Sequence, residues 1–184
     1  MKYKRVVQLP NCCVLACVTM ILHRHGFTHI NQEYIGQWLS RNVPREDVHD
    51  APPKGWVMRA GKEDIYLNSF FTDVKLPFTI KKHFVTSTPG LKQFLAKNKC
   101  QDIIVCFDPS VLYKVQQEPG GHVCVVESFD EGSVVLVDPS EKYVALHGGR
   151  TPITVAMNDL VEAFENYGEV NGAGLWLITN GRRK

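Results

Sequence analysis

The stretch Gln8-Leu9-Pro10-Asn11-Cys12-Cys13-Val14-Leu15-Ala16-Cys17 leads from a polar segment with a proline into an apolar run. Asn11 is of a residue type that caps helices and Gly26 of one that ends them, so we expect a helix of about four turns that begins at Cys12. Apolar residues cover most of its circumference, which is typical of a helix inside a core. The stretch therefore predicts a buried helix with cysteines in its first turn.

A cysteine at the start of a helix lies among unpaired backbone N–H groups, which favour its thiolate form. Gln8 lies five positions before Cys13. An amide side chain held there can donate a hydrogen bond to the oxyanion that forms when a thiolate attacks a carbonyl. Cys12, four positions after Gln8, is the alternative nucleophile, whereas Cys17 is expected to pack in the core. The pattern favours Cys13 as a cysteine nucleophile.

Two later segments can supply the imidazole and the carboxylate that such a thiol needs. His122 opens an apolar run to Phe129, and Asp138 follows the apolar run 134–137. These runs predict a hairpin with its turn at 130–132, which places His122 and Asp138 at the same open end. A carboxylate there can hold the second imidazole N–H and fix the tautomer. Asp138-Pro139 is equally typical of a plain turn, and both interpretations stay open at this point.

These residues resemble the peptidase C39-like branch of the papain-like cysteine peptidases. The first half of that family's motif is a glutamine, a short gap, the cysteine, and then a small residue, a methionine and a leucine. Its second half is an apolar strand that opens with Gly-His and is followed by Asp-Pro about sixteen residues later. The matching residues here are Gln8, Cys13, Cys17, Met20 and Leu22, then Gly121-His122 and Asp138-Pro139.

The resemblance implies a papain-like fold, in which N-terminal helices pack on a C-terminal antiparallel β-sheet. It also implies roles: Cys13 as nucleophile, His122 as base, Asp138 as its orienting group and Gln8 as oxyanion donor. The implied reaction is thiol peptidase or amidase chemistry on a peptide or a small amide or acyl substrate, which a carrier can present. An acyltransferase on the same scaffold is the alternative. Val14 after the nucleophile and the short gap from Gln8 also leave open a non-catalytic binding module.

The rest of the chain predicts an α+β protein of a single domain over residues 1–184, without repeats or a linker. Helices are expected at 32–41, 91–98 and 157–164, and 43–55 is expected to form a loop. Residues 56–87 are ambiguous, with the apolar residues of 65–71 compatible with a helix. Further strands are expected at 78–80, 83–85, 102–107, 143–146 and 175–179.

Composition sets limits on the function. The net charge of +2 does not indicate a nucleic-acid partner, and no run approaches the ~20 apolar residues of a membrane span. Three of the six cysteines crowd one helical turn, which argues against a disulfide framework and favours the cytoplasm. Short metal-ligand spacings and nucleotide-binding motifs are missing, so we expect neither a metal nor a cofactor.

Overall fold

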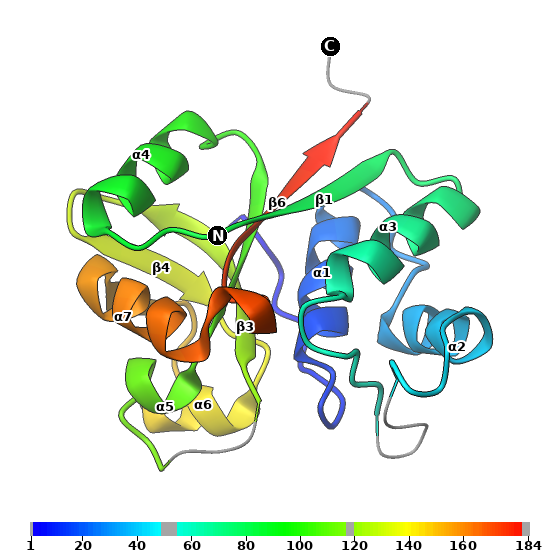
Figure 1. The fold of residues 1–184 in the computed structure, drawn as a ribbon, viewed down its shortest axis with the longest axis horizontal. Coiled ribbons are helices and arrows are strands. Elements are labelled where there is room, and N and C mark those ends of the chain that lie inside the picture. The colour runs from blue at the N-terminus through cyan, green and yellow to red at the C-terminus, as the bar shows by residue number, and fades with distance from the viewer. Residues whose placement is uncertain (1, 49–54, 117–119, 182–184) are drawn as a thin grey trace.

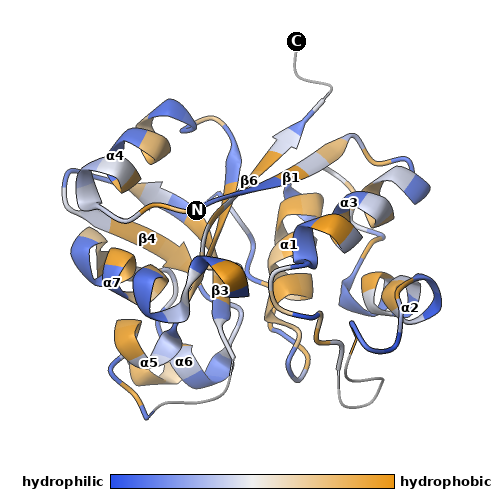
Figure 2. Cartoon of the chain, in the orientation of Figure 1, coloured by the Kyte–Doolittle hydropathy of each residue, from blue (hydrophilic) through white to orange (hydrophobic). Residues whose placement is uncertain are grey.

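The computed structural model describes residues 2–48, 55–116 and 120–181. Three helices near the N-terminus lie together on one side of the molecule (Figure 1). They are α1 (Cys13–Arg24), α2 (Gln32–Asn42) and α3 (Glu63–Asp73). Every residue of α1 from Leu15 to Leu22 is buried, as expected for an apolar helix in a core, and Figure 2 shows α1 as hydrophobic.

A six-stranded sheet in the order β1-β6-β2-β3-β4-β5 follows, and every neighbouring pair is antiparallel. Its strands are β1 (Phe78–His83), β2 (Asp102–Phe107), β3 (His122–Phe129), β4 (Ser133–Val137), β5 (Ile153–Ala156) and β6 (Gly174–Asn180). The predicted α+β architecture, with N-terminal helices and an antiparallel sheet, is confirmed.

Helices cover both faces of the sheet. Because side chains alternate along a strand, neighbouring residues of one strand pack on opposite faces. Ile104 and Cys106 of β2 pack with α1, α2 and α3, whereas Ile103 and Val105 pack in a second hydrophobic cluster. The second cluster contains residues of α4 (Thr88–Lys97), α5 (Pro109–Leu112), α6 (Glu141–Leu146) and α7 (Met157–Tyr167). β2 is therefore buried on both faces, which explains its unbroken apolar run.

A β-bulge interrupts the β3–β4 hairpin at Glu127. Val126 pairs with Leu136 on one side of it, and Ser128 pairs with Val135 on the other. The bulge adds one residue to β3, and one residue of shift exchanges the faces of a strand. If the pairing of Val125 with Val137 is extended by one residue, Asp138 lies opposite Cys124 and on the same face as His122. A regular hairpin would set Asp138 opposite Val125, on the face that packs against α1.

Several local expectations were wrong. Asn11 does not cap α1, because its backbone is left-handed (φ 58°), and the helix begins at Cys13 with Cys12 as the N-cap residue. Residues 143–146 belong to α6 rather than to a strand, since Ser140 accepts a hydrogen bond from the Tyr143 N–H and starts a helix there. The expected pair of strands at 78–85 is the single strand β1.

Elements that the pattern did not indicate are α5, β5 and the short helix η1 (Glu169–Asn171). Residues 49–54 of the expected loop lie outside the described residues. Within the described part of the chain, none of the helices is long and apolar enough to cross a membrane.

Candidate active site

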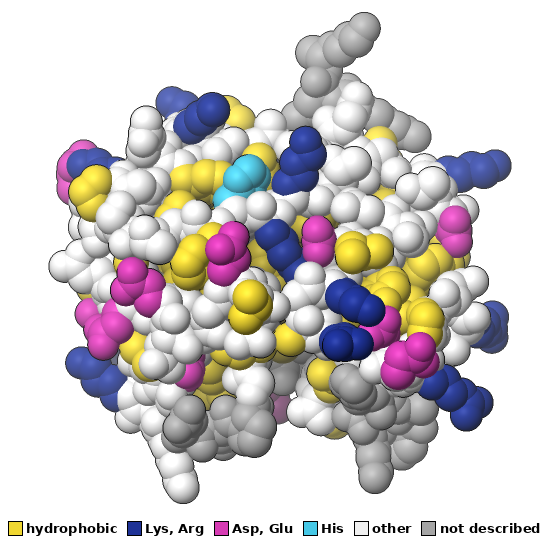
Figure 3. Space-filling model, in the orientation of Figure 1, with side chains coloured by type: hydrophobic (Ala, Val, Ile, Leu, Met, Phe, Trp, Pro, Cys, Tyr) yellow, Lys and Arg dark blue, Asp and Glu magenta, His cyan; other side chains and the backbone are white. Residues whose placement is uncertain are grey.

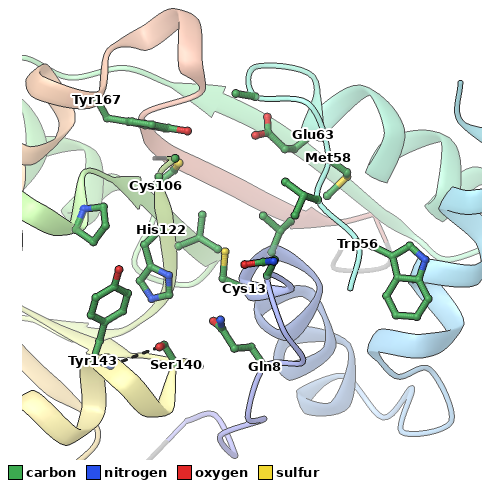
Figure 4. A pocket seen from close by; sticks show the side chains of 18 of the residues that line it. Gln8, Cys13, Trp56, Met58, Glu63, Cys106, His122, Ser140, Tyr143 and Tyr167 are labelled. Carbon is green, nitrogen blue, oxygen red and sulfur yellow. Dashed lines mark hydrogen bonds between the residues drawn. The ribbon is translucent and has the colours of Figure 1, made fainter. Parts of the chain in front are cut away.

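A cleft of about 640 Å³ lies where the beginning of α1 meets the open end of the β3–β4 hairpin. Segments far apart in the sequence line it (Figure 4). The lining includes Gln8, Asn11, Cys13, Val14, Trp56, Met58, Glu63, Cys106, Gly121, His122, Lys142, Tyr143 and Tyr167. On the face drawn in Figure 3, acidic and basic side chains are interspersed with hydrophobic ones rather than gathered by sign.

The turn at residues 9–12 presents Cys13 to the cleft. The Cys12 N–H donates to the Leu9 carbonyl at 3.0 Å, and the left-handed Asn11 reverses the chain just before the helix. Gly55 touches this turn: a Cβ there would lie 1.7 Å from the Pro10 carbonyl oxygen. Cys13 is half-buried and lines the cleft as the first residue of α1.

The other cysteines near the cleft are buried. Cys12 is fully buried, and its sulfur accepts a hydrogen bond from the Trp56 N–H at 3.2 Å. Burial raises the pKa of the Cys12 thiol, and burial raises the pKa of Cys17 further still. Cys106 lines the cleft but is 3% exposed, and burial raises its pKa well above the usual thiol range. The geometry thus favours Cys13 over Cys12 as a nucleophile.

His122 and Asp138 form a buried pair at the end of the hairpin. The His122 Nε2 lies 2.9 Å from the Asp138 Oδ1, and the two residues are 4% and 0% exposed. An ionised carboxylate only accepts hydrogen bonds, so Nε2 carries the proton. The ring's other nitrogen, Nδ1, remains for the thiol. Figure 4 shows the Cys13 side chain beside the ring.

Two further donors hold the Asp138 carboxylate. The Ser140 N–H donates to Oδ1 at 2.7 Å, and the Tyr113 hydroxyl donates to Oδ2 at 2.6 Å. The backbone of the same turn is held as well: the Arg5 Nε donates to the Asp138 carbonyl at 2.8 Å. Both carboxylate oxygens and the backbone of Asp138 therefore have partners.

The charges of this pair stabilise each other. Burial alone would lower the pKa of His122, but the Asp138 charge and hydrogen bond, together with the contact with Cys13, raise it to about 10. Burial alone would raise the pKa of Asp138, but the His122 charge and the hydrogen bonds from His122, Tyr113 and Ser140 lower it. The pair is therefore an imidazolium and a carboxylate near neutral pH.

Gln8 lines the cleft together with Cys13 and His122. Gln32 of α2 fixes the backbone around it, because its side chain accepts from the Leu9 N–H at 3.0 Å and donates to the Val7 carbonyl at 2.8 Å. The Gln8 N–H donates to the Pro139 carbonyl at 3.0 Å, which joins this segment to the Asp138 turn. Figure 4 shows the Gln8 side chain directed toward Cys13 and His122.

Glu63 and Tyr167 lie in another part of the cleft wall. Glu63 is 6% exposed and pairs with Lys82 of β1 at 2.6 Å. The Tyr167 ring covers Gly121, where a Cβ would lie 2.5 Å from the ring carbons. A glycine before His122 is therefore required for this packing.

One group of described residues has the composition of a metal site. Single ligand atoms of His122, Cys124 and Asp138 lie within 4.8 Å of one another. All three residues are buried, and the Asp138 oxygens already accept from His122, Ser140 and Tyr113. Burial also raises the pKa of the Cys124 thiol well above its usual range, which opposes the thiolate that a metal ligand requires. The group fits a hydrogen-bonded cluster better than a metal centre.

No family model matches the sequence, and no curated protein matches it. Among solved structures, the chain is similar to a protein from Bacillus anthracis described as a "putative C39-like peptidase". The superposition covers 96% of this chain and 94% of that chain, with a TM-score of 0.57 and 12% sequence identity. The likeness is one of fold, and it confirms that this chain has the architecture of a C39-like peptidase structure.

The structure brings together the four residues singled out in the sequence. Cys13, His122 and Gln8 line one cleft, and Asp138 lies behind His122. Sequence reasoning missed Tyr113, which lies behind the cleft, and the cleft residues Glu63, Trp56, Tyr143 and Tyr167. Each lies far in sequence from Cys13 and His122 or carries no motif of its own, so only the fold shows where it lies.

Proposed function

We propose that this chain is a thiol hydrolase that cleaves an amide or peptide bond with Cys13 as nucleophile, His122 as proton carrier and Asp138 as orienting group. The observation that carries the proposal is the relay from the cleft into the core: a half-buried thiol beside an imidazole whose far nitrogen bonds a buried carboxylate. The fold shared with a C39-like peptidase structure supports a peptide as substrate.

The reaction follows from these positions. The proton of the Cys13 thiol rests on the His122 Nδ1 as part of the imidazolium, and the sulfur attacks the substrate carbonyl carbon as a thiolate. The C–N bond then breaks, and the leaving amine takes the Nδ1 proton from His122. Water, deprotonated by the His122 Nδ1, attacks the thioester, which releases the acid and restores the thiolate beside the imidazolium. Asp138 stabilises the imidazolium and keeps its proton on Nε2 throughout.

Gln8 and the backbone N–H of Cys13 are the proposed oxyanion donors. The Gln8 side chain points toward Cys13 and His122, and its amide nitrogen is a donor of the kind that an oxyanion needs. Loss of one oxyanion donor typically slows the chemical step by about 10²–10³-fold. We expect Gln8→Ala to lower kcat by this factor with little change in thiol alkylation, since alkylation forms no oxyanion.

Selective alkylation tests the nucleophile. The protein is treated with limiting iodoacetamide near pH 7, and each cysteine is quantified by peptide mass spectrometry. We expect Cys13 to react well ahead of the other five thiols, and His122→Ala to remove that advantage. Cys12→Ala is the matched control and should leave it intact. Slow, uniform labelling of all exposed thiols would contradict the proposal.

Hydrolysis itself is tested with a peptide library in H₂¹⁸O. We expect new carboxyl termini that carry ¹⁸O, with the wild-type chain and not with Cys13→Ala. A product that forms only when an added amine accepts the acyl group would instead identify a transferase.

The six cysteines are free thiols, which supports our inference that the protein works in the reducing cytoplasm.

A further inference from the structure

A hydroxyl group is buried behind the proposed triad. Tyr113, 8% exposed, directly follows α5 and points its OH at the Asp138 Oδ2, 2.6 Å away. The same hydroxyl lies 3.5 Å from the Cys124 sulfur, also in the core. Burial, followed by the Cys124 and Asp138 groups, raises the pKa of Tyr113 well above its usual range, so the phenol stays protonated and acts as the donor to the carboxylate.

The carboxylate can orient the imidazole only if it cannot rotate. Oδ1 accepts from His122 and from the Ser140 N–H, and both donors lie on the same oxygen. The Tyr113 hydroxyl donates to the other oxygen, Oδ2, and the Cys124 thiol also interacts with this carboxylate. Without the Tyr113 hydroxyl, Oδ2 loses its short hydrogen bond, which costs free energy unless the group turns or takes up a proton.

The aromatic ring of Tyr113 is itself held from several sides. Its centroid lies 5.6 Å from that of Phe107 and 4.9 Å from that of Tyr143, and both of these rings also contact His122. Its backbone is anchored by the hydrogen bond from the Tyr113 N–H to the Pro109 carbonyl at 3.0 Å. The hydroxyl is thus delivered to Asp138 by a rigid support.

We propose that Tyr113 is a positioning residue of the site: its hydroxyl fixes Asp138 so that Oδ1 faces the His122 Nε2, and through Asp138 it sets the reactivity of Cys13. The proposal rests on the proposed function. Tyr113 does not line the cleft and so acts on the substrate only through Asp138 and His122.

Tyr113→Phe is the direct test, because it removes the hydroxyl and keeps the ring. Loss of a hydrogen bond to a charged group of this kind is expected to lower the second-order rate of Cys13 alkylation by about 10- to 100-fold. In peptide hydrolysis, kcat should fall by a similar factor while KM stays nearly constant. The NMR signal of the His122 Nε2 proton, which reports its bond to Asp138, should shift or broaden.

Tyr66→Phe is the matched control. The Tyr66 hydroxyl also donates to a buried aspartate, Asp47, and neither residue lines the cleft. This variant removes the same kind of hydrogen bond away from the cleft, and it should leave the alkylation rate and the His122 signal unchanged.

A double-mutant cycle separates positioning from folding. If Tyr113 acts through Asp138, Tyr113→Phe should change the alkylation rate by less than about two-fold in an Asp138→Ala background. The proposal is overturned if the effects of Tyr113→Phe and Asp138→Ala on the alkylation rate are fully additive. It is also overturned if Cys13 is reactive in the wild-type chain and Tyr113→Phe is alkylated at the wild-type rate. An unreactive Cys13 in the wild-type chain would instead refute the proposed function, so the two failures are distinguishable.

Discussion

The tripeptide Asp-Pro-Ser occurs twice, at 108–110 directly after β2 and at 138–140 directly after β4. The two turns share one local hydrogen bond. In each, the aspartate Oδ1 accepts the serine N–H two residues later at 2.7 Å. Each turn also leads into a short helix, α5 or α6. Such turns are ordinary side-chain-to-backbone chemistry.

The two aspartates differ in what reaches them from elsewhere in the chain. The Oδ2 of Asp108 accepts from the Asn166 side chain of α7, which fastens α5 to that helix. Asp138 accepts from His122 and from Tyr113. The same local sequence therefore builds a structural anchor at one strand end and the rear of the candidate site at the other. The distant partner, not the turn, decides the role.

Removing each carboxylate in turn is the strongest test of this difference between Asp108 and Asp138. Asp138→Ala should lower the rate of peptide hydrolysis by about 10²–10⁴-fold, because His122 loses the group that sets its tautomer and stabilises its charge. Asp108→Ala should stay within about three-fold of the wild type, since its carboxylate does not contact His122. Initial rates with a cleaved peptide measure both. Equal losses would mean that both turns act only on folding.

The protonation of His122 sharpens the comparison further. Its pKa of about 10 should fall in Asp138→Ala, because only the smaller contribution of Cys13 then opposes the lowering by burial. Asp108→Ala should leave it near 10. An NMR titration of the ring between pH 5 and 11 measures this, with His122→Ala to assign the signal.

The same shift predicts how stability depends on pH. The folded-state pKa of His122 lies above its unfolded value, so the charged pair contributes its full stabilisation below pH ~6.5 and loses it as the pH rises toward about 10. The stability difference between the wild type and His122→Ala should therefore shrink over that range. Urea unfolding at pH 6, 8 and 10 measures it, and a constant difference would contradict the assignment.

The anchoring role of Asp108 predicts a smaller, purely structural effect. Asp108→Ala removes the cap of α5 and the bond to Asn166, and it should lower the free energy of unfolding by about 1–2 kcal/mol. Asn166→Ala should cost less, and the double variant less than the sum, because the two residues share one hydrogen bond. Urea denaturation tests the prediction, and strict additivity would show that this bond contributes nothing.

The serines should matter least. Ser140→Ala loses the cap to the Tyr143 N–H, and Ser110→Ala loses the hydroxyl bond to Asp108 at 2.6 Å. Each should cost about 0.5–1 kcal/mol of stability. Hydrolysis should remain within about two-fold in Ser140→Ala, because the backbone N–H that holds Asp138 persists. A large loss of activity would show that the Ser140 hydroxyl itself takes part.

The two Asp-Pro-Ser turns also explain how far the sequence could be interpreted. Asp138-Pro139 was equally typical of a turn and of a catalytic carboxylate, and the structure shows a turn whose carboxylate also bonds His122. Spacing along a hairpin could place Asp138 at the same end as His122, because strand geometry is regular. It could not reveal the bulge at Glu127 that sets the two residues on one face. Nor could it reveal Tyr113, which approaches from a short helix that no apolar period marks.

Errors in secondary structure had a similar origin. Residues 143–146 form a short apolar run of the kind that occurs in strands, but the cap at Ser140 and the packing of Tyr143 against Tyr113 place them in a helix. Asn11 was expected to cap α1, yet the close approach of Gly55 to Pro10 selects a different turn. In both places a contact between distant segments overrides the local preference.

Because of the bulge at Glu127, the geometry of the candidate site depends on the exact number of residues in β3. Only with this additional residue do His122 and Asp138, 16 positions apart, emerge on a common side of the hairpin. Loss of Glu127 alone would keep every proposed catalytic side chain in the sequence and turn the carboxylate away from the imidazole. Within this hairpin, natural variation and protein engineering are therefore less free to delete a residue than to replace one.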